Sequence, residues 1–262
     1  MNTLLEKKCT FVIPIRIDCE ERVRNLRTVV DWLIPLCAPI LILEADKEQH
    51  ISFDTFGNNS NNLLSVHFVK DEERVFHRTH YINELIKLAK TPFVAVWDAD
   101  IIIDREQILR AVCYYLIEER YTLICPYNKE CAYLNEHMSH IFSANHNIDF
   151  LHHKKLKSYI GRPVCGGAYI VNKRLYNSIG GENENFIGWG PEDAERIRRT
   201  QIMGHKMGWI EDGNCAYHLY HPQNENSRFF SEETALSTRQ EFIKVCSMNR
   251  EELSEYIKTM PR

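Results

Sequence analysis

The sequence predicts an α/β fold with a mostly parallel central sheet. Short, continuously apolar runs alternate along the chain with segments whose apolar residues recur every three or four positions. This alternation is typical of buried strands joined by helices. The length of 262 residues and the 44% hydrophobic content suffice for one large domain with a full core.

Five apolar runs in the first half of the chain predict buried strands. Parallel strands are covered by helices on both faces, so they are apolar throughout rather than alternating. The runs are 10–15, 40–43, 63–69, 93–97 and 121–125.

Three amphipathic segments lie between these runs. Residues 20–33, 79–89 and 104–116 each place their apolar side chains on one helical face. Asp104 is the expected N-cap of the third helix, and Gln107 three positions later completes the pattern of a capping box. Right-handed strand–helix–strand units built from these pieces would form the sheet.

The pattern changes in the second half. Residues 127–160 are polar and His-rich without a sustained period, and we expect them to cover the edge or mouth of the sheet. A further strand is expected at 168–171, another ends within 216–221, and two helices follow. The second of these helices begins at Asn249, capped with Glu252.

The composition excludes several classes of function. The net charge of −4 and a pI of about 6.3 provide no basic field for nucleic acid. The longest apolar stretch, Trp32 to Leu43, is too short and too proline-rich to span a bilayer. The N-terminus lacks the apolar core of a signal peptide, and nine scattered cysteines without a CxxC are typical of reduced thiols. We therefore expect a cytoplasmic protein.

One local tract is basic, running from His152 through Lys154 and Lys155 to Lys157. Such a tract is ordinarily a solvated surface. The alternative is contact with anionic head groups, which would place the protein peripherally at the inner face of a membrane.

Polar side chains occur where the predicted strands end. Arg16 follows the first strand, Glu44 ends the second, and Asp98 and Asp100 follow the fourth, while Arg78 precedes a helix. In open α/β sheets, ligands bind beyond the carboxyl ends of the strands. We therefore expect these side chains to line one site.

Asp98 and Asp100 are the first candidates for metal binding. Two positions apart on an extended chain, they leave on the same face, and their mutual repulsion is relieved by a cation such as Mg²⁺ or Mn²⁺. A lone Asp-x-Asp motif is usually a surface turn, but this one ends a strongly apolar run. His218 and His221 would either add nitrogen ligands or be partly exposed imidazoles at a strand end.

Residues 163–199 hold the densest set of candidates. Gly166 and Gly167 allow close approach of the backbone to a ligand, and Trp189 offers a flat apolar face between two glycines. The segment Pro191-Glu192-Asp193 then opens a charged helix, where the dipole favours carboxylates. The alternative is a plain strand–turn–helix connector.

Together these motifs resemble the GT-A glycosyltransferases. The matching residues are Asp98-x-Asp100, Gly166-Gly167, Gly181, the string Gly188-Trp189-Gly190-Pro191-Glu192-Asp193, and a late His. The last string is most similar to the C-terminal segment of β-1,4-galactosyltransferases and of bacterial family 2 enzymes similar to chondroitin polymerase, with Pro191 in place of a third Gly. The resemblance covers roughly residues 10–221.

This resemblance implies a single Rossmann-like GT-A domain over 1–262. Its nucleotide-binding half would span about 10–126, its acceptor half about 127–221, and C-terminal helices about 222–262. The implied cofactor is Mn²⁺ or Mg²⁺, the donor a UDP-sugar, and the acceptor a glycan or lipid-linked glycan, as in polysaccharide biosynthesis. The resemblance alone favours galactose or N-acetylgalactosamine as the donor sugar.

The resemblance also implies roles for single residues. Asp100 would bind the metal directly with His221, and with His218 at a position where galactosyltransferases have Met. Asp193 matches the catalytic base, while Trp189 and Glu192 match acceptor-site and donor-sugar residues. The residues matched to donor binding are Pro14, Arg16, Glu44, Arg78, Asp98, Gly166 and Gly167.

The chemistry is consistent with these roles. The leaving diphosphate must be neutralised, which a metal does, and the acceptor hydroxyl must lose a proton, which requires a carboxylate. One base without an enzyme nucleophile implies a single displacement with inversion. A nucleotidyltransferase usually has a Gly-rich loop after the first strand, and the segment IRIDCEERVRN contains no Gly. A non-catalytic carbohydrate-binding module would tolerate loss of the Asp pair, which is present here.

Overall fold

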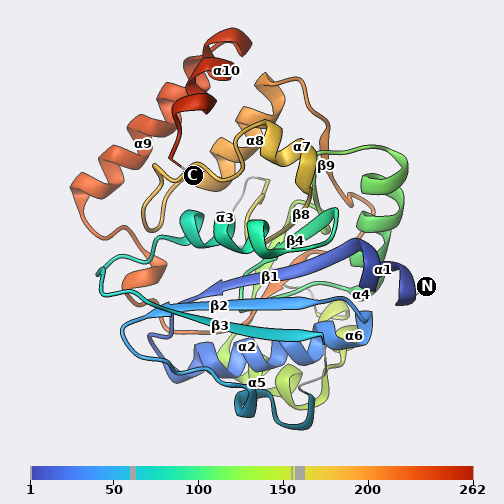
Figure 1. Ribbon diagram of the computed structural model, residues 1–262. Coiled ribbons are helices and arrows are strands. Elements are labelled where there is room, and N and C mark those ends of the chain that lie inside the picture. The colour runs from blue at the N-terminus through green and yellow to red at the C-terminus, as the bar shows by residue number, and fades with distance from the viewer. Residues whose placement is uncertain (1, 60–62, 155, 157–162, 262) are drawn as a thin grey trace.

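A seven-stranded sheet lies at the centre of the computed structural model, which describes residues 2–59, 63–154, 156 and 163–261 (Figure 1). Its strand order is β3-β2-β1-β4-β8-β6-β9. Neighbouring strands are parallel except β8, which is antiparallel to both β4 and β6. The strands are β1 (Cys9–Ile15), β2 (Ile40–Asp46), β3 (Leu64–Lys70), β4 (Phe93–Trp97), β6 (Leu123–Cys125), β8 (Ala168–Asn172) and β9 (Met207–Trp209).

A small second sheet, of order β5-β10-β7, lies next to the end of β4. It joins β5 (Ile101–Ile102) to β10 (Ala216–His218) antiparallel and β10 to β7 (Cys131–Tyr133) parallel. Because β5 follows β4 after only three residues, this sheet brings β10 to the carboxyl end of the central sheet.

Helices cover both faces, with α2 on one side of β1–β3 and α3 on the other (Figure 1). The C-terminal helices α9 and α10 pack on α8. The helices are α1 (Asn2–Lys8), α2 (Glu20–Leu33), α3 (Arg78–Leu88), α4 (Arg105–Arg110), α5 (Glu136–Asn145), α6 (Ile148–His152), α7 (Lys173–Ser178), α8 (Glu192–Ile202), α9 (Glu232–Ser247) and α10 (Arg250–Thr259). Among the described residues, no helix has the length and apolarity needed to cross a membrane.

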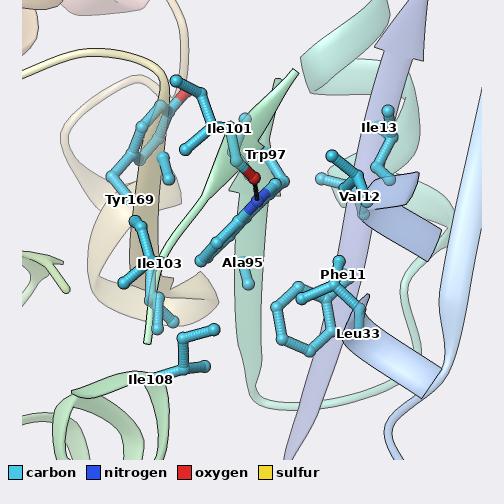
Figure 2. Packing of buried hydrophobic residues seen from close by; sticks show 14 of the residues in the cluster. Phe11, Val12, Ile13, Leu33, Ala95, Trp97, Ile101, Ile103, Ile108 and Tyr169 are labelled. Atoms are coloured by element: carbon cyan, nitrogen blue, oxygen red, sulfur yellow. Dashed lines mark hydrogen bonds between the residues drawn. The ribbon is translucent and has the colours of Figure 1, made fainter. Parts of the chain in front are cut away.

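The core packs around Trp97, the last residue of β4. The Trp97 ring is fully buried and meets Phe11 of β1 edge-on, with 5.4 Å between ring centroids (Figure 2). Its indole Nε1 donates to the carbonyl oxygen of Ile101 at 2.8 Å. This bond spans the turn 98–100, so the hydrophobic core itself fixes the turn that carries the Asp-x-Asp motif.

The predicted α/β class and mostly parallel sheet are confirmed, and the five apolar runs are strands β1, β2, β3, β4 and β6. The capping box at Asn249 and Glu252 is also confirmed. The capping box predicted at Asp104 is wrong in the role given to Gln107. Asp104 accepts from the backbone N–H of Glu106, but the side-chain amide of Gln107 donates to the loop carbonyl oxygens of Pro126 and Asn214.

Candidate active site

The turn after β4 is held at three points. Besides the Trp97 indole, the N–H of Ile101 donates to the carbonyl oxygen of Asp98 at 3.3 Å, and the N–H of Asp98 donates to that of Gly167 at 2.8 Å. The last contact joins the Asp-x-Asp turn to the glycine pair that precedes β8. The two motifs, about 65 residues apart in the chain, therefore form one wall.

Asp100 lies beside the two histidines at the end of β10. The N–H of Leu219 donates to the backbone oxygen of Asp100 at 2.8 Å and so fixes the two segments together. The Nε2 atoms of His221 and His218 lie 3.3 and 3.6 Å from the two carboxylate oxygens of Asp100. Potential ligand atoms of the three side chains all lie within 4.8 Å of one another.

The histidine tautomers favour metal binding. The Nδ1 of His218 lies 2.8 Å from the carbonyl oxygen of Leu219, and the Nδ1 of His221 lies 2.8 Å from that of Pro222. A carbonyl oxygen can only accept, so each Nδ1 carries a proton and donates it. The Nε2 atoms then face Asp100, and an Nε2 that gives up its proton would present its lone pair beside that carboxylate, as second-shell bonds direct it in metal sites.

Electrostatics keep the Asp100 carboxylate ionised. Burial alone would raise its pKa, but the charges of His218, His221 and Arg22 outweigh burial, and the net shift is downward. Arg22 of α2 places Nη1 3.6 Å from Asp100, and its Nε donates to Asp18 at 2.7 Å. An ionised carboxylate with two imidazole nitrogens fits a divalent cation such as Mn²⁺.

A second acidic cluster fits a metal less well. Glu44, Asp46 and His50 also have close ligand atoms. However, the fully buried Glu44 carboxylate accepts from the backbone N–H groups of His50 and Ile51 and lies 3.0 Å from the His50 ring nitrogen. Glu44 therefore closes the turn after β2, and its oxygens are occupied.

Asp98 is paired with Arg78 at the start of α3. The guanidinium contacts one carboxylate oxygen through Nε at 3.1 Å and Nη2 at 2.5 Å. Burial lowers the pKa of Arg78, but the charge of Asp98 outweighs it and the net shift is upward. For the Asp98 carboxyl, burial raises the pKa and outweighs the opposing charge of Arg78, so the contact with Arg78 is what favours its ionised form.

A cavity of about 460 Å³ opens beside the ends of β1 and β2. It is lined by Arg16, Ile17, Asp18, Asp46, Lys47, Glu73, Arg74, Gln223, Asn224, Asn226 and Arg228. A smaller cavity of about 50 Å³ is lined by Arg78, Trp189 and Glu192 among others. Arg74, Asn226 and Arg228 line both, so two arginines stand where the cavities adjoin.

Arg16 shapes the larger cavity rather than filling it. Its guanidinium donates to the carbonyl oxygens of Ala45 and Glu73 and to the carboxylate of Asp71, at 2.5–2.9 Å. Arg16 thus fixes the segment that carries Arg74 onto the end of the sheet.

The two carboxylates at the start of α8 differ in their surroundings. Glu192 is buried, its Oε2 finds no partner among the described residues, and burial, followed by the charge of Asp193, raises the pKa of Glu192 to about 8. Asp193 instead accepts from Arg196 Nη1 at 2.8 Å. A Cβ atom at Gly166 would lie 1.9 Å from Asp193 Oδ2, so only glycine allows this carboxylate its position.

Most of the residues singled out in the sequence converge here. Asp98, Asp100, Gly166, Gly167, His218 and His221 form one wall, with Arg78, Trp189, Glu192 and Asp193 beside it. Pro14 is buried within β1, and neither it nor Glu44 lines either cavity. Of the basic tract, Lys155 and Lys157 lie outside the described residues.

Four arginines were missed from the sequence. Arg22 and Arg196 could have been found by helical spacing, because each lies one turn after a carboxylate, Asp18 and Asp193. No local signal marks Arg74 or Arg228, which meet only through the fold.

A family model described as the N-terminal domain of galactosyltransferase matches residues 151–222, which include the glycine pair, the start of α8 and both histidines. A search of curated proteins gives no match. Among solved structures, a complex of a mutant Drosophila β-1,4-galactosyltransferase 7 with manganese, UDP-Gal and xylobiose aligns with a TM-score of 0.54 at 15% identity, over 86% of this chain and 76% of that one.

A second solved structure, GalNAc-T7 with UDP, GalNAc and Mn²⁺, aligns with a TM-score of 0.61 at 12% identity. The alignment covers 95% of this chain but only half of that one. At this level of identity the similarity defines the architecture. The chain therefore has the fold of the GT-A glycosyltransferases.

Proposed function

We propose that the protein is a metal-dependent glycosyltransferase that moves a hexose or N-acetylhexosamine from a UDP-sugar to a glycan hydroxyl. One observation carries the proposal. The turn that carries Asp100 of the cation-binding cluster and an ionisable carboxylate border the same glycine pair, since the N–H of Asp98 in that turn donates to Gly167 while Gly166 faces Asp193. A sugar seated at this pair would have its leaving group near Asp100 and its acceptor near Asp193.

The donor would lie across the two cavities. The nucleoside fits the larger cavity at the ends of β1 and β2, as open α/β sheets bind nucleotides. The sugar fits beside Trp189 and Glu192, and Arg74 and Arg228 at the junction face the diphosphate between them. Both similar solved structures were complexed with manganese, one with UDP-Gal and the other with UDP.

Asp100, His218 and His221 would hold the cation. When bound, it would neutralise the charge that grows on the departing diphosphate. The protein itself orients these ligands through the backbone carbonyls of Leu219 and Pro222.

Asp193 is proposed as the general base. The acceptor oxygen attacks the anomeric carbon, its proton passes to the Asp193 carboxylate, and the bond from that carbon to the diphosphate oxygen breaks, with UDP taking the electron pair. Because no other side chain is needed as a nucleophile, one displacement inverts the anomeric centre. An α-linked UDP-sugar would give a β-linked product.

The test is UDP release from a panel of UDP-sugars with Mn²⁺, with and without EDTA. We expect one donor, UDP-galactose or UDP-N-acetylgalactosamine first, to release UDP only with metal and to raise the melting temperature most, because a bound ligand stabilises the folded state. A nucleotidyltransferase would release pyrophosphate from a nucleoside triphosphate instead. A binding module would be stabilised by a glycan and release nothing.

A further inference from the structure

Helix α8 has two fully buried arginines one turn apart, Arg196 and Arg199. Each makes two contacts with a buried glutamate. Arg196 meets Glu182 through Nε and Nη2 at 3.0 Å each, and Arg199 meets Glu195 through Nε at 2.7 Å and Nη2 at 3.2 Å. Arg199 also donates to the carbonyl oxygens of Ile179 and Gly181, whereas Arg196 has its further partner at the site, the carboxylate of Asp193.

The Arg196 guanidinium is fixed on its remaining sides. It lies over the ring of Tyr169, 3.9 Å from the centroid. The hydroxyls of Tyr169 and Tyr176 both donate to Glu182 Oε1, and the backbone N–H of Glu182 donates to Asn83 at 2.9 Å. A planar group held by two parallel bonds and a ring face has little freedom, so Nη1 presents its donor in one direction.

That direction selects one oxygen of Asp193. Arg196 Nη1 occupies Oδ1 at 2.8 Å, whereas Oδ2 faces the Cα of Gly166. The Gly166 backbone is itself held, because the Tyr127 hydroxyl donates to its carbonyl oxygen at 2.7 Å. The Asp193 carboxylate is therefore held between the buried Arg196 guanidinium and the fixed backbone of Gly166.

We propose that Arg196 is the positioning residue of the base: by occupying Oδ1 it leaves Oδ2, at the glycine pair, as the oxygen that takes the acceptor proton. This inference rests on the proposed function. Arg196 does not touch the substrate. Its effect is on the geometry of proton transfer, which should appear in kcat and not in donor or metal binding.

Arg196→Lys and Arg199→Lys form a matched pair of variants. Both keep the charge and lose a two-point contact with a buried glutamate, so both should lower the melting temperature. Arg199→Lys also loses contacts with two backbone carbonyls, so a larger loss of kcat in Arg196→Lys would not reflect a larger structural loss. We expect Arg196→Lys to lose about 10- to 100-fold in kcat, with KM for the donor and the Mn²⁺ requirement unchanged, because a misplaced base forfeits much of its contribution. Arg199→Lys should retain wild-type kcat below its melting temperature.

Gly166→Ala provides a second measurement without any change in buried charge. Its Cβ would displace Oδ2, and neither Gly166 nor the control Gly208 has a positive φ. At Gly208 a Cβ would meet only the Tyr121 ring, at 3.0 Å. We expect Gly166→Ala to lose about 100-fold in kcat with unchanged UDP affinity, and Gly208→Ala to keep its turnover.

The outcomes separate the two claims. Equal kcat in Arg196→Lys and Arg199→Lys, or normal kcat in Gly166→Ala, overturns the positioning role while wild-type transfer stands. If Arg196→Lys does not fold, the comparison of Gly166→Ala with Gly208→Ala decides. Absence of metal-dependent transfer in the wild type would instead defeat the proposed function, and normal turnover in Asp193→Asn would defeat the base assignment on which this inference rests.

Discussion

The site contains two pairs of carboxylates, and they have different neighbours. Asp98 and Asp100 at the end of β4 lie beside Arg78, Arg22 and two imidazoles. At the start of α8, Asp193 accepts a hydrogen bond from Arg196, while Oε2 of Glu192 has no partner among the described residues.

This difference separates two kinds of chemistry. Arg22 and the two imidazoles keep Asp100 ionised and place ring nitrogens beside it, which suits a cation. In the second pair, burial raises the pKa of Glu192 to about 8, so near neutral pH Glu192 is mainly protonated. In the proposed function, the first pair would hold a cation and the second would provide the base.

The largest effect is expected from Asp100→Asn. The amide cannot supply the anionic ligand, so we expect metal-dependent UDP binding to disappear and transfer to fall by at least about 10³-fold, since several kcal/mol of transition-state stabilisation is lost. The measurement is UDP affinity by calorimetry with Mn²⁺ and with EDTA.

His50→Ala is the control for this variant. It alters the second acidic cluster, whose His50 ring is 42% exposed, and should keep the Mn²⁺ dependence. Unchanged UDP affinity in Asp100→Asn under both conditions would remove the metal-site assignment, and loss of Mn²⁺ dependence in His50→Ala would move it to the second cluster.

Asp193→Asn should have the next largest effect. The amide keeps the shape of the carboxylate but cannot accept the proton, so we expect transfer to fall by at least about 100-fold while UDP affinity and metal dependence persist. Single-turnover kinetics measure the loss, and NMR of the wild-type product gives its anomer. Near-normal turnover would contradict the base assignment, and an α-linked product from an α-linked donor would contradict the single displacement.

The fold was largely predictable because its signals are local. Buried parallel strands need apolar runs, and each run from 10–15 to 121–125 contains only one strand. Gln107 escaped prediction because a loop carbonyl 107 residues away, at Asn214, competes for its amide. Such long-range demand leaves no pattern in the local sequence.

The site was predictable in its acids and not in its arginines. Asp98, Asp100 and Asp193 stand out because each ends or starts an element. Glu44 has the same signal, yet its carboxylate closes a turn, because it accepts from the backbone N–H groups of His50 and Ile51. Strand ends therefore indicate the edge of the sheet where a site forms, while tertiary contacts decide which side chains face it.

Trp189→Ala, next to Glu192, should lower transfer less than Asp193→Asn does. Trp189 is 50% exposed and lines the smaller cavity with Glu192, and its ring meets that of Phe229 edge-on with 4.6 Å between the ring centroids. Losing a ring that packs on a sugar should reduce transfer by about tenfold, in line with one aromatic contact, and leave UDP affinity unchanged. A normal transfer rate would show that Trp189 only packs against Phe229.

The last expected effect is on stability rather than on transfer, and it tests the comparison directly. The pKa of Glu192 rises from its ordinary value of 4.5 to about 8 in the folded protein, chiefly through burial. Between these values the unfolded chain has released the proton while the folded chain still holds it, so the free energy of unfolding falls as pH rises through this window. The slope is at most about 1.4 kcal/mol per pH unit, and it vanishes below about 4.5 and above about 8.

Glu192→Gln has no proton to release, so its stability relative to wild type should increase from pH 5 to pH 8 in urea titrations with EDTA. Asp193→Asn should narrow the pH range over which stability falls, because the charge of Asp193 is the second cause of the raised pKa of Glu192. Parallel stability curves for wild type and Glu192→Gln would mean that Glu192 is ionised in the folded protein, and the contrast with Asp100 would be lost.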